Sequence, residues 1–287
     1  MTSGEVRATA QHGSVYPLPY HDGERQRLKK QHNGLMGIMH NEPIHSPISS
    51  LRPKKIVDVG CGINADMTMY FAKRFPDAQI YGVDLARVDM PREQIPPNVV
   101  FIQGNITTLV NSDPRLASGS VDFLYSRLLA SGMQDWRAYI QCVTSLLRAG
   151  GILEMHDLAG LTLMEGEVPA FEESKWSRYY RENGVKKLGL DMEFDKADVI
   201  MKGLGLKDVS IKQYRLPWGA AKEESEHAWD SEGRAQWYAA LVMFMTNLVS
   251  DEEQAVRDEI LAEFHGQASP PREGLYFPFY VAWGSKP

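Results

Sequence analysis

A short apolar run that ends in two glycines constrains the fold of this chain more than any other feature of its sequence. Residues 56–59 contain three β-branched side chains, a pattern that predicts a buried strand. Gly60 and Gly62 follow at once, and because glycine has no Cβ they permit a tight turn and a close approach of the backbone to a ligand. A helix is expected to begin near Asn64 to Asp66. The stretch predicts a strand-turn-helix unit that binds a ligand, although a turn without a ligand is the alternative that the glycines alone leave open.

A carboxylate follows at the spacing that such units use to hold a ribose. Residues 80–83 form a second apolar run that ends on Asp84, about twenty residues after Gly62. In a strand-turn-helix-strand unit this spacing places Asp84 at the tip of the neighbouring strand, where it accepts hydrogen bonds from both ribose hydroxyls of a nucleoside. A dinucleotide is less well accommodated, because residues 63–65 lack the third glycine of the G-x-G-x-x-G fingerprint.

The acid before the turn makes the pattern more specific. Asp58 gives the motif D-x-G-x-G, which together with Asp84 resembles motif I and the acidic ribose loop of class I S-adenosylmethionine (SAM) methyltransferases. The resemblance implies that Asp58 and the turn hold the amino-acid end of SAM and that Asp84 holds its ribose. Many members have glycine where this chain has Asn64, and Asn tolerates a positive φ well enough for the turn to form.

Strand and helix patterns alternate downstream and predict one Rossmann-like α/β domain. Further strand patterns lie at residues 99–102, 121–127, 152–157, 209–214 and 277–287, and helix patterns lie at 67–75 and 136–147. We expect a seven-stranded, mostly parallel sheet with helices on both faces, in which residues 277–287 resemble the family's antiparallel edge strand. The domain is expected to span residues 51–287, with a helical substrate-pocket insertion at about 158–205.

The resemblance also implies the other cofactor contacts. The position of Asn105 usually carries an acid that contacts the adenine amino group, and the Asn side-chain oxygen can accept the same hydrogen bond; a plain turn at Gly104 and Asn105 is the alternative. The end of the fourth strand faces the methyl group in the family. The full set of expected cofactor-binding residues is Tyr16, Asp58, Gly60, Cys61, Gly62, Asp84, Leu85, Gly104, Asn105, Ile106, Ser126 and Arg127.

The segment before the first strand predicts a lid. Residues 1–50 are assigned to an N-terminal tail and lid, in which residues 1–14 are polar and expected to be disordered. Residues 23–39 repeat large side chains, His32 among them, at helical spacing. Because this segment must cross the edge of the sheet where ligands bind, we interpret it as a helix that closes on the cofactor; a helix packed on the edge of the core is the alternative.

Two later segments bear on the acceptor and on assembly. The insertion contains a predicted helix over residues 171–182 with four large aromatic side chains, which suits an apolar acceptor but is also typical of ordinary packing. A second helix is predicted over residues 192–204. The helical pattern at 234–248 is expected to cover the sheet or to contribute to a homodimer surface.

SAM carries its methyl group on a cationic sulfur, so positioning alone can lower much of the barrier, and a base is needed only if the acceptor must lose a proton. His156, at the end of the fifth strand, is the first candidate, followed by His32 and Asp157; a structural role is the alternative for each. The chain has no H-E-x-x-H, C-x-x-C or G-x-S-x-G motif, so no metal site is expected and zinc or serine hydrolysis is disfavoured.

Composition limits the partners. The 287 residues carry a net charge of −6 without any Lys/Arg run longer than two, which disfavours nucleic acid. Two cysteines, no apolar run of membrane-spanning length and a polar N-terminus indicate a soluble, cytoplasmic chain that does not bind membranes.

A narrower resemblance covers most of the chain from about residue 15. The segment 146–154, Asp135-Trp136, Arg27-Leu28-x-x-Gln31-His32 and the last eleven residues are similar to the fungal branch of methyltransferases that includes the secondary-metabolism regulator LaeA. The resemblance implies methyl transfer from SAM to an O or N atom of a small apolar metabolite, with S-adenosylhomocysteine (SAH) as product. A LaeA-like regulator and a SAM-assisted cyclase are the alternatives.

Overall fold

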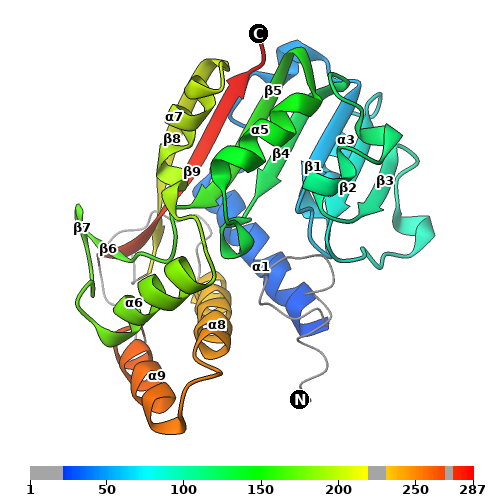
Figure 1. The fold of residues 1–287 in the computed structure, drawn as a ribbon. Coiled ribbons are helices and arrows are strands. Elements are labelled where there is room, and N and C mark those ends of the chain that lie inside the picture. The colour runs from blue at the N-terminus through cyan, green and yellow to red at the C-terminus, as the bar shows by residue number, and fades with distance from the viewer. Residues whose placement is uncertain (1–21, 219–230, 269–273) are drawn as a thin grey trace.

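The computed structural model describes residues 22–218, 231–268 and 274–287, and its centre is the predicted parallel sheet (Figure 1). Five parallel strands lie in the order β3-β2-β1-β4-β5. Their bounds are β1 Lys55–Val59, β2 Gln79–Asp84, β3 Val99–Gln103, β4 Val121–Arg127 and β5 Leu147–Leu158. Because β1 lies between β2 and β4 in the sheet, the turn after β1 lies between the ends of those two strands.

The antiparallel part of the sheet differs from the expectation in one respect. The last strand, β9 (Leu275–Ser285), pairs antiparallel with β5, but it is not an edge strand, because β8 (Lys207–Pro217) pairs along its other side. A two-residue hairpin, β6 (Met164–Glu165) and β7 (Val168–Pro169), joins the start of β9. The seven predicted strands are therefore present, and the sequence patterns missed the hairpin.

Helices cover both faces of the sheet, as predicted, and the parallel strands are therefore buried on both sides. Along β1, Ile56 packs with Phe71 of α3 (Asp66–Arg74) on one face. Val57 packs on the opposite face with Ile140 of α5 (Trp136–Leu146) and Met201 of α7 (Ala197–Gly203). The period of two along the strand thus separates the two core layers.

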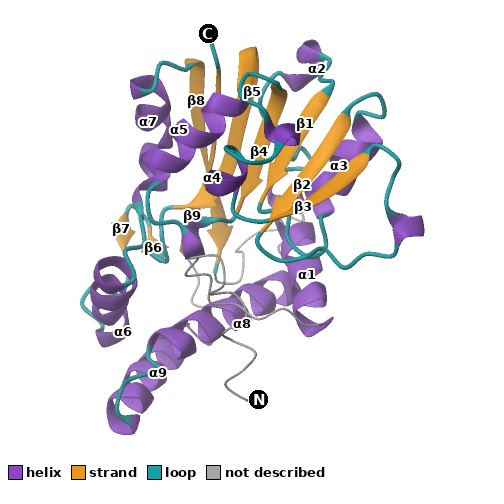
Figure 2. Ribbon diagram, turned by 45° about the vertical axis from the view of Figure 1, so that its right-hand side comes forward, coloured by secondary structure: helices purple, strands orange, loops and turns teal. Residues whose placement is uncertain are grey.

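A third group of helices lies beyond the carboxyl ends of the parallel strands (Figure 2). It comprises α1 (Asp22–Ile38), α8 (Ser231–Leu248), α9 (Gln254–Ala268) and α6 (Lys175–Tyr179), which continues as a π-helical segment Tyr180–Lys187. Helix α1 packs against α8, and α6 packs against α9. These helices share a hydrophobic cluster that includes Leu35, Trp176, Phe244 and Phe264.

Several boundaries differ from the predictions. The helix expected over 171–182 begins at Lys175 and runs on to Lys187, and the one expected over 192–204 begins as a 3₁₀ turn before α7. The sequence patterns did not predict α9. Short elements complete the chain: α2 (Ile48–Leu51), α4 (Ile106–Leu109) and 3₁₀ turns at Arg92–Gln94, Pro114–Leu116, Ala130–Gly132 and Glu193–Lys196. No helix in the three described ranges is long and apolar enough to cross a membrane.

Candidate functional site

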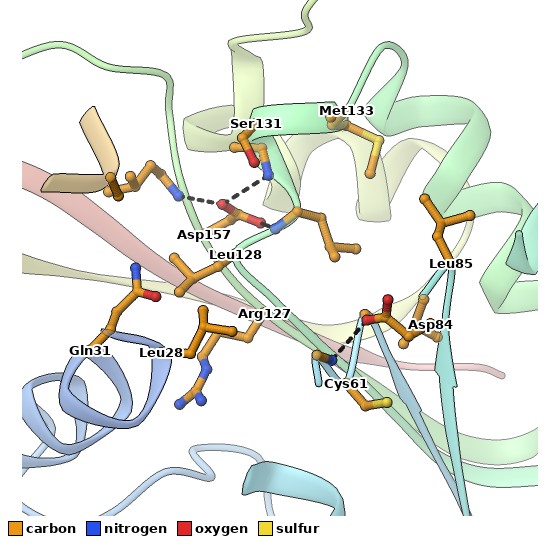
Figure 3. Close-up of a pocket in the computed structure, with 18 of the residues that line it drawn as sticks. Leu28, Gln31, Cys61, Asp84, Leu85, Arg127, Leu128, Ser131, Met133 and Asp157 are labelled. Carbon is orange, nitrogen blue, oxygen red and sulfur yellow. Dashed lines mark hydrogen bonds between the residues drawn. The ribbon is translucent and has the colours of Figure 1, made fainter. Parts of the chain in front are cut away.

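A cavity of about 480 Å³ lies at the carboxyl edge of the parallel strands, within the range of ~300–1,000 Å³ that small-molecule sites occupy (Figure 3). Its walls come from α1, the turn after β1, the ends of the strands, residues 128–135 and α8. Twelve of the predicted site residues line it: His32, Asp58, Gly60, Cys61, Gly62, Asp84, Leu85, Gly104, Asn105, Ile106, Arg127 and Asp157. Ser126 and His156 do not line it, and Tyr16 lies outside the described residues.

The turn after β1 has the tight geometry that its glycines predicted. Gly60 and Gly62 have φ values of +68° and +69°, which favour glycine. The amides of Gly60 and Cys61 both donate to the carbonyl of Val83 at 2.8 and 3.1 Å, and the amide of Gly62 donates to Asp84 Oδ2 at 2.8 Å. The three backbone donors of the turn are thus directed at β2 and hold the turn against the neighbouring strand.

The turn forms with Asn64 in it, as expected, although with a different backbone geometry at that residue. Asn64 does not adopt a positive φ; the next residue, Ala65, does so at +51°, just before α3 begins. The Asn64 side chain donates instead to the carbonyl of Arg25 at 2.8 Å, and Arg25 Nη1 donates to the carbonyl of Ile63 at 3.0 Å. Asn64 therefore ties the turn to α1.

Two carboxylates flank the turn. Asp58 is almost fully buried and accepts a 2.6 Å hydrogen bond from the Thr68 hydroxyl, and burial raises its pKa to about 6. Asp84 accepts backbone hydrogen bonds from Gly62 and Ala86, both at 2.8 Å, while burial raises its pKa. Both side chains line the cavity, so the acid before the turn and the acid after it lie where the motif predicted.

The loop after β3 lies beside Asp84. The Gly104 amide donates to the Asp84 carbonyl at 2.8 Å, which places Asn105 at the start of α4. The Asn105 Oδ1 accepts from the Thr107 amide at 3.0 Å and from the Thr107 hydroxyl at 2.9 Å. The Asn105 oxygen, which was expected to accept a hydrogen bond from the adenine amino group, therefore already caps the N-terminus of α4. The contact with adenine stays a prediction.

The end of β4 separates two residues that the sequence grouped together. Ser126 is buried and does not line the cavity, whereas Arg127 lines it. Arg127 Nη2 donates to His32 Nδ1 on α1 at 2.8 Å. Because burial and the Arg127 cation disfavour a second positive charge, the pKa of His32 falls to about 4, so the imidazole is neutral at physiological pH.

Asp157 lines the cavity from the end of β5. Its carboxylate accepts backbone hydrogen bonds from Leu129 at 2.5 Å, Leu158 at 2.9 Å and Ala130 at 3.3 Å (Figure 3). Burial raises its pKa to about 7, although the three donors favour the ionised form. Asp157 thereby fixes the start of the segment 128–135, where Leu128 adopts a positive φ of 59°.

His156 points away from the cavity into a buried polar cluster. Its Nε2 lies 2.7 Å from Glu154 Oε1 and its Nδ1 lies 3.2 Å from the Tyr125 hydroxyl. Glu154 also accepts the amides of His45 and Ser46 at 2.8 and 2.9 Å. Burial alone would raise the pKa of Glu154, but its bonds from the two histidines lower it to about 2. Both ring nitrogens of His156 are engaged inside the protein, so its position does not suit a base for a ligand in the cavity.

The sequence missed several lining residues. Tyr139, interpreted as part of the apolar face of α5, lines the cavity, and burial raises the pKa of its hydroxyl. Helix α8 contributes Trp237, Ala240, Leu241 and Phe244 to the cavity wall, and a role in a homodimer surface stays a prediction. Of the aromatic stripe at 171–180, Tyr180 alone lines the cavity. The others pack elsewhere, such as Trp176 on Phe264 with ring centroids 5.3 Å apart.

Comparisons with known proteins agree with this geometry. A family model for a methyltransferase domain matches residues 57–155. The chain is 30% identical over 213 residues to methyltransferase str3 from Strobilurus tenacellus, and the match covers 70% of each protein. It is 28% identical over 149 residues to the secondary metabolism regulator laeA from Coprinopsis cinerea, a match that covers 50% of this chain and 36% of that protein.

A solved structure with a similar fold is the YcgJ protein from Bacillus subtilis. It aligns with a TM-score of 0.50 at 17% identity, over 89% of this chain and 98% of that one. At this level of identity the match supports the fold alone.

Proposed function

Since the chain belongs to the class I SAM-dependent methyltransferase family, we propose that it transfers the methyl group of SAM to an oxygen or nitrogen atom of a small, largely apolar acceptor, a fungal secondary metabolite, and releases SAH. The observation that carries the proposal is the continuity of the cavity. One end is lined by Asp58, Gly62 and Asp84, and the other end is apolar.

The first end fits the cofactor. A Cβ at Gly62 would meet no atom of the described residues within 4 Å, so the turn leaves open space beside the Asp84 carboxylate. Asp84 keeps lone pairs for ribose hydroxyls after its two backbone bonds, because a carboxylate offers about four acceptor positions. When bound there, SAM supplies an electrophilic methyl group.

The second end suits an apolar acceptor. Leu161, Tyr180 and Leu190 of the insertion line the cavity together with Leu241 and Phe244 of α8. The rings of Tyr180 and Phe244 pack on each other, with their centroids 5.9 Å apart. Such side chains exclude water and hold an acceptor by its apolar surface, which supports transfer through orientation at near-attack distance.

Asp157 is the best-placed base among the three candidates. It lines the cavity with a pKa of about 7, near the value that favours proton transfer at neutral pH. His32 commits its unprotonated nitrogen to Arg127, and His156 lies in the buried cluster. For a phenol or an ammonium acceptor the proton would pass to Asp157, whereas a carboxylate acceptor is already ionised and needs no base.

The test is SAH formation. The protein is incubated with SAM and a panel of apolar phenols, amines and carboxylic acids, and SAH and methylated products are measured by mass spectrometry. Calorimetric titration with SAM comes first, with Asp84→Ala as the control. SAM binding followed by acceptor-dependent SAH supports the proposal. Absence of SAM binding refutes it, and a cyclised or rearranged product without SAH assigns the chain to the cyclase alternative.

A further inference from the structure

The buried polar cluster brings three metal-binding side chains together: His45, Glu154 and His156. Glu154 Oε1 lies 2.7 Å from His156 Nε2 and 3.7 Å from His45 Nδ1, and all three atoms lie within 4.8 Å of one another. None of the three residues lines the cavity. We propose that this cluster binds one divalent transition-metal ion and that zinc suits it best. The proposal does not depend on SAM or on methyl transfer.

The donor set and its spacing both suit zinc. Two imidazole nitrogens and one carboxylate oxygen are ligands that zinc accepts, whereas magnesium and calcium prefer oxygen alone. Tetrahedral zinc holds its ligands at about 2.1 Å, which keeps the donor atoms about 3.4 Å apart. The distances from Glu154 Oε1 to the two histidines lie on either side of that value, so modest shifts of the side chains bring the three donors around one ion.

Two segments of the chain supply the ligands. Glu154 and His156 are two residues apart on β5 and therefore point to the same face of the sheet. His45 lies on the connector between α1 and α2, residues 39–47, and its amide and that of Ser46 donate to the two Glu154 oxygens. The bonds that attach the connector thus deliver the third ligand. Motif spacing could not reveal the site, because His45 and Glu154 are 109 residues apart in the chain.

Each ligand is oriented by a contact on its far side. His156 Nδ1 lies 3.2 Å from the Tyr125 hydroxyl, and His45 Nε2 lies 2.5 Å from the Tyr214 hydroxyl. Metal-binding histidines almost always donate their other N–H in this way, and ligating carboxylates accept further hydrogen bonds, as Glu154 does from the two amides. The ion takes the place of the proton between His156 and Glu154, and His156 then carries its proton on Nδ1.

The position of His45 Nδ1 favours a metal site over a plain hydrogen-bonded network. Its contact with Glu154 Oε1, at 3.7 Å, is too long for a normal hydrogen bond. An ion between the two atoms engages both. The Glu154 and His156 side chains are fully buried, whereas that of His45 is 8% exposed, so an ion enters from the side of the connector. Once bound, it links the connector to β5.

The experiment is a zinc titration of tag-free protein that has been stripped with EDTA and dialysed free of it. Zinc affinity is measured by competition with a chromophoric chelator, and thermal unfolding is followed with and without zinc. His45→Phe removes one donor but keeps the backbone amide and a ring. Tyr214→Phe removes only the hydroxyl that orients His45. His40→Asn is the matched control, because His40 is an exposed histidine on the same connector and Asn tolerates its positive φ of 55°. Circular dichroism checks that each variant is folded.

We expect wild type to bind one zinc ion per chain and its Tm to rise by about 5 °C at a hundredfold excess over Kd. His45→Phe should weaken binding by roughly 100-fold or more, and Tyr214→Phe by about 10- to 100-fold. His40→Asn should bind as wild type does, and magnesium should not compete.

Three results would overturn the inference. Folded wild type that binds no zinc at micromolar concentration leaves the cluster as a hydrogen-bonded network. Equal zinc affinity in wild type, His45→Phe and Tyr214→Phe places the ion elsewhere. Loss of binding in His40→Asn assigns the ion to the protein surface. Each result is independent of SAM binding, so the proposed function stands or fails separately.

Discussion

Alanine at Gly60 and alanine at Gly62 form a matched pair that isolates one packing contact of the cofactor turn. Both glycines have left-handed φ values, of +68° and +69°, so a side chain at either position carries similar backbone strain, about 1–2 kcal/mol. The surroundings differ. A Cβ at Gly60 would lie 2.3 Å from Cδ2 of Leu129, whereas a Cβ at Gly62 would meet no described atom within 4 Å.

The clash sets the expected difference. Leu129 must move, and forcing an extra methyl group into packed surroundings costs about 1–3 kcal/mol. We therefore expect Gly62→Ala to lower the free energy of unfolding by about 1–2 kcal/mol and Gly60→Ala to lower it by about 2–5 kcal/mol. Because the Leu129 amide is bonded to Asp157, its movement also disturbs the cavity wall, so SAH affinity should fall in Gly60→Ala.

Urea unfolding of the ligand-free variants measures this difference, and a double-mutant cycle with Leu129→Ala assigns its cause. Leu129→Ala removes the atom that clashes, so the double variant should be more stable than the sum of the single changes by about 1–3 kcal/mol. Equal destabilisation by the two glycine substitutions, or strictly additive costs in the cycle, would refute the packing argument.

Three further predictions concern polar groups. Asp84→Ala should weaken SAM binding by about 1.5–3 kcal/mol, and calorimetry that finds an unchanged affinity removes Asp84 from the ribose site. His156→Gln should lower the free energy of unfolding by about 1–3 kcal/mol while SAH formation by the folded enzyme changes little, since the substitution breaks the bond to Glu154; a large rate loss at unchanged stability would restore His156 as the base. The folded pKa of His32, about 4, lies below its ordinary 6.5, so its stabilising contribution is complete above pH 6.5 and is lost as the pH falls to 4, at about 1.4 kcal/mol per pKa unit. His32→Asn should flatten that part of the stability curve, and a curve identical to wild type contradicts the assignment.

The cofactor end of the site was predictable because local rules determine it. Asp58, Gly60 and Gly62 follow one another on a strand and its turn, and Asp84 ends the next strand, so sequence spacing translates directly into position. The turn formed as predicted, and the difference concerns which residue has the positive φ. Ala65, not Asn64, adopts the left-handed conformation, because the Asn64 side chain is held by the backbone of α1.

The acceptor end could not be predicted in the same way. His156 and Asp157 are adjacent on β5 and therefore point to opposite faces, and sequence alone does not say which face meets the cavity. Tyr139 has the spacing of a core residue, and a hydroxyl at the margin of an apolar stripe gives no local signal. Helix α8 reaches the cavity through packing on segments far from it in the chain, chiefly α1, about two hundred residues earlier.

The buried cluster around His156 gives the predicted lid a fixed point. Glu154 accepts the amides of His45 and Ser46, so the segment between α1 and β1 is attached to the central sheet. Before that anchor, His40 and Asn41 have φ values of 55° and 60° and end the helix.

A hinge movement of α1 about His40 and Asn41 would leave this anchor in place. It would first break the contacts of Arg25 with Ile63 and of His32 with Arg127, both of which lie at the cofactor corner. His156, which the sequence suggested as a base, therefore contributes through Glu154 to the attachment of the segment between α1 and β1.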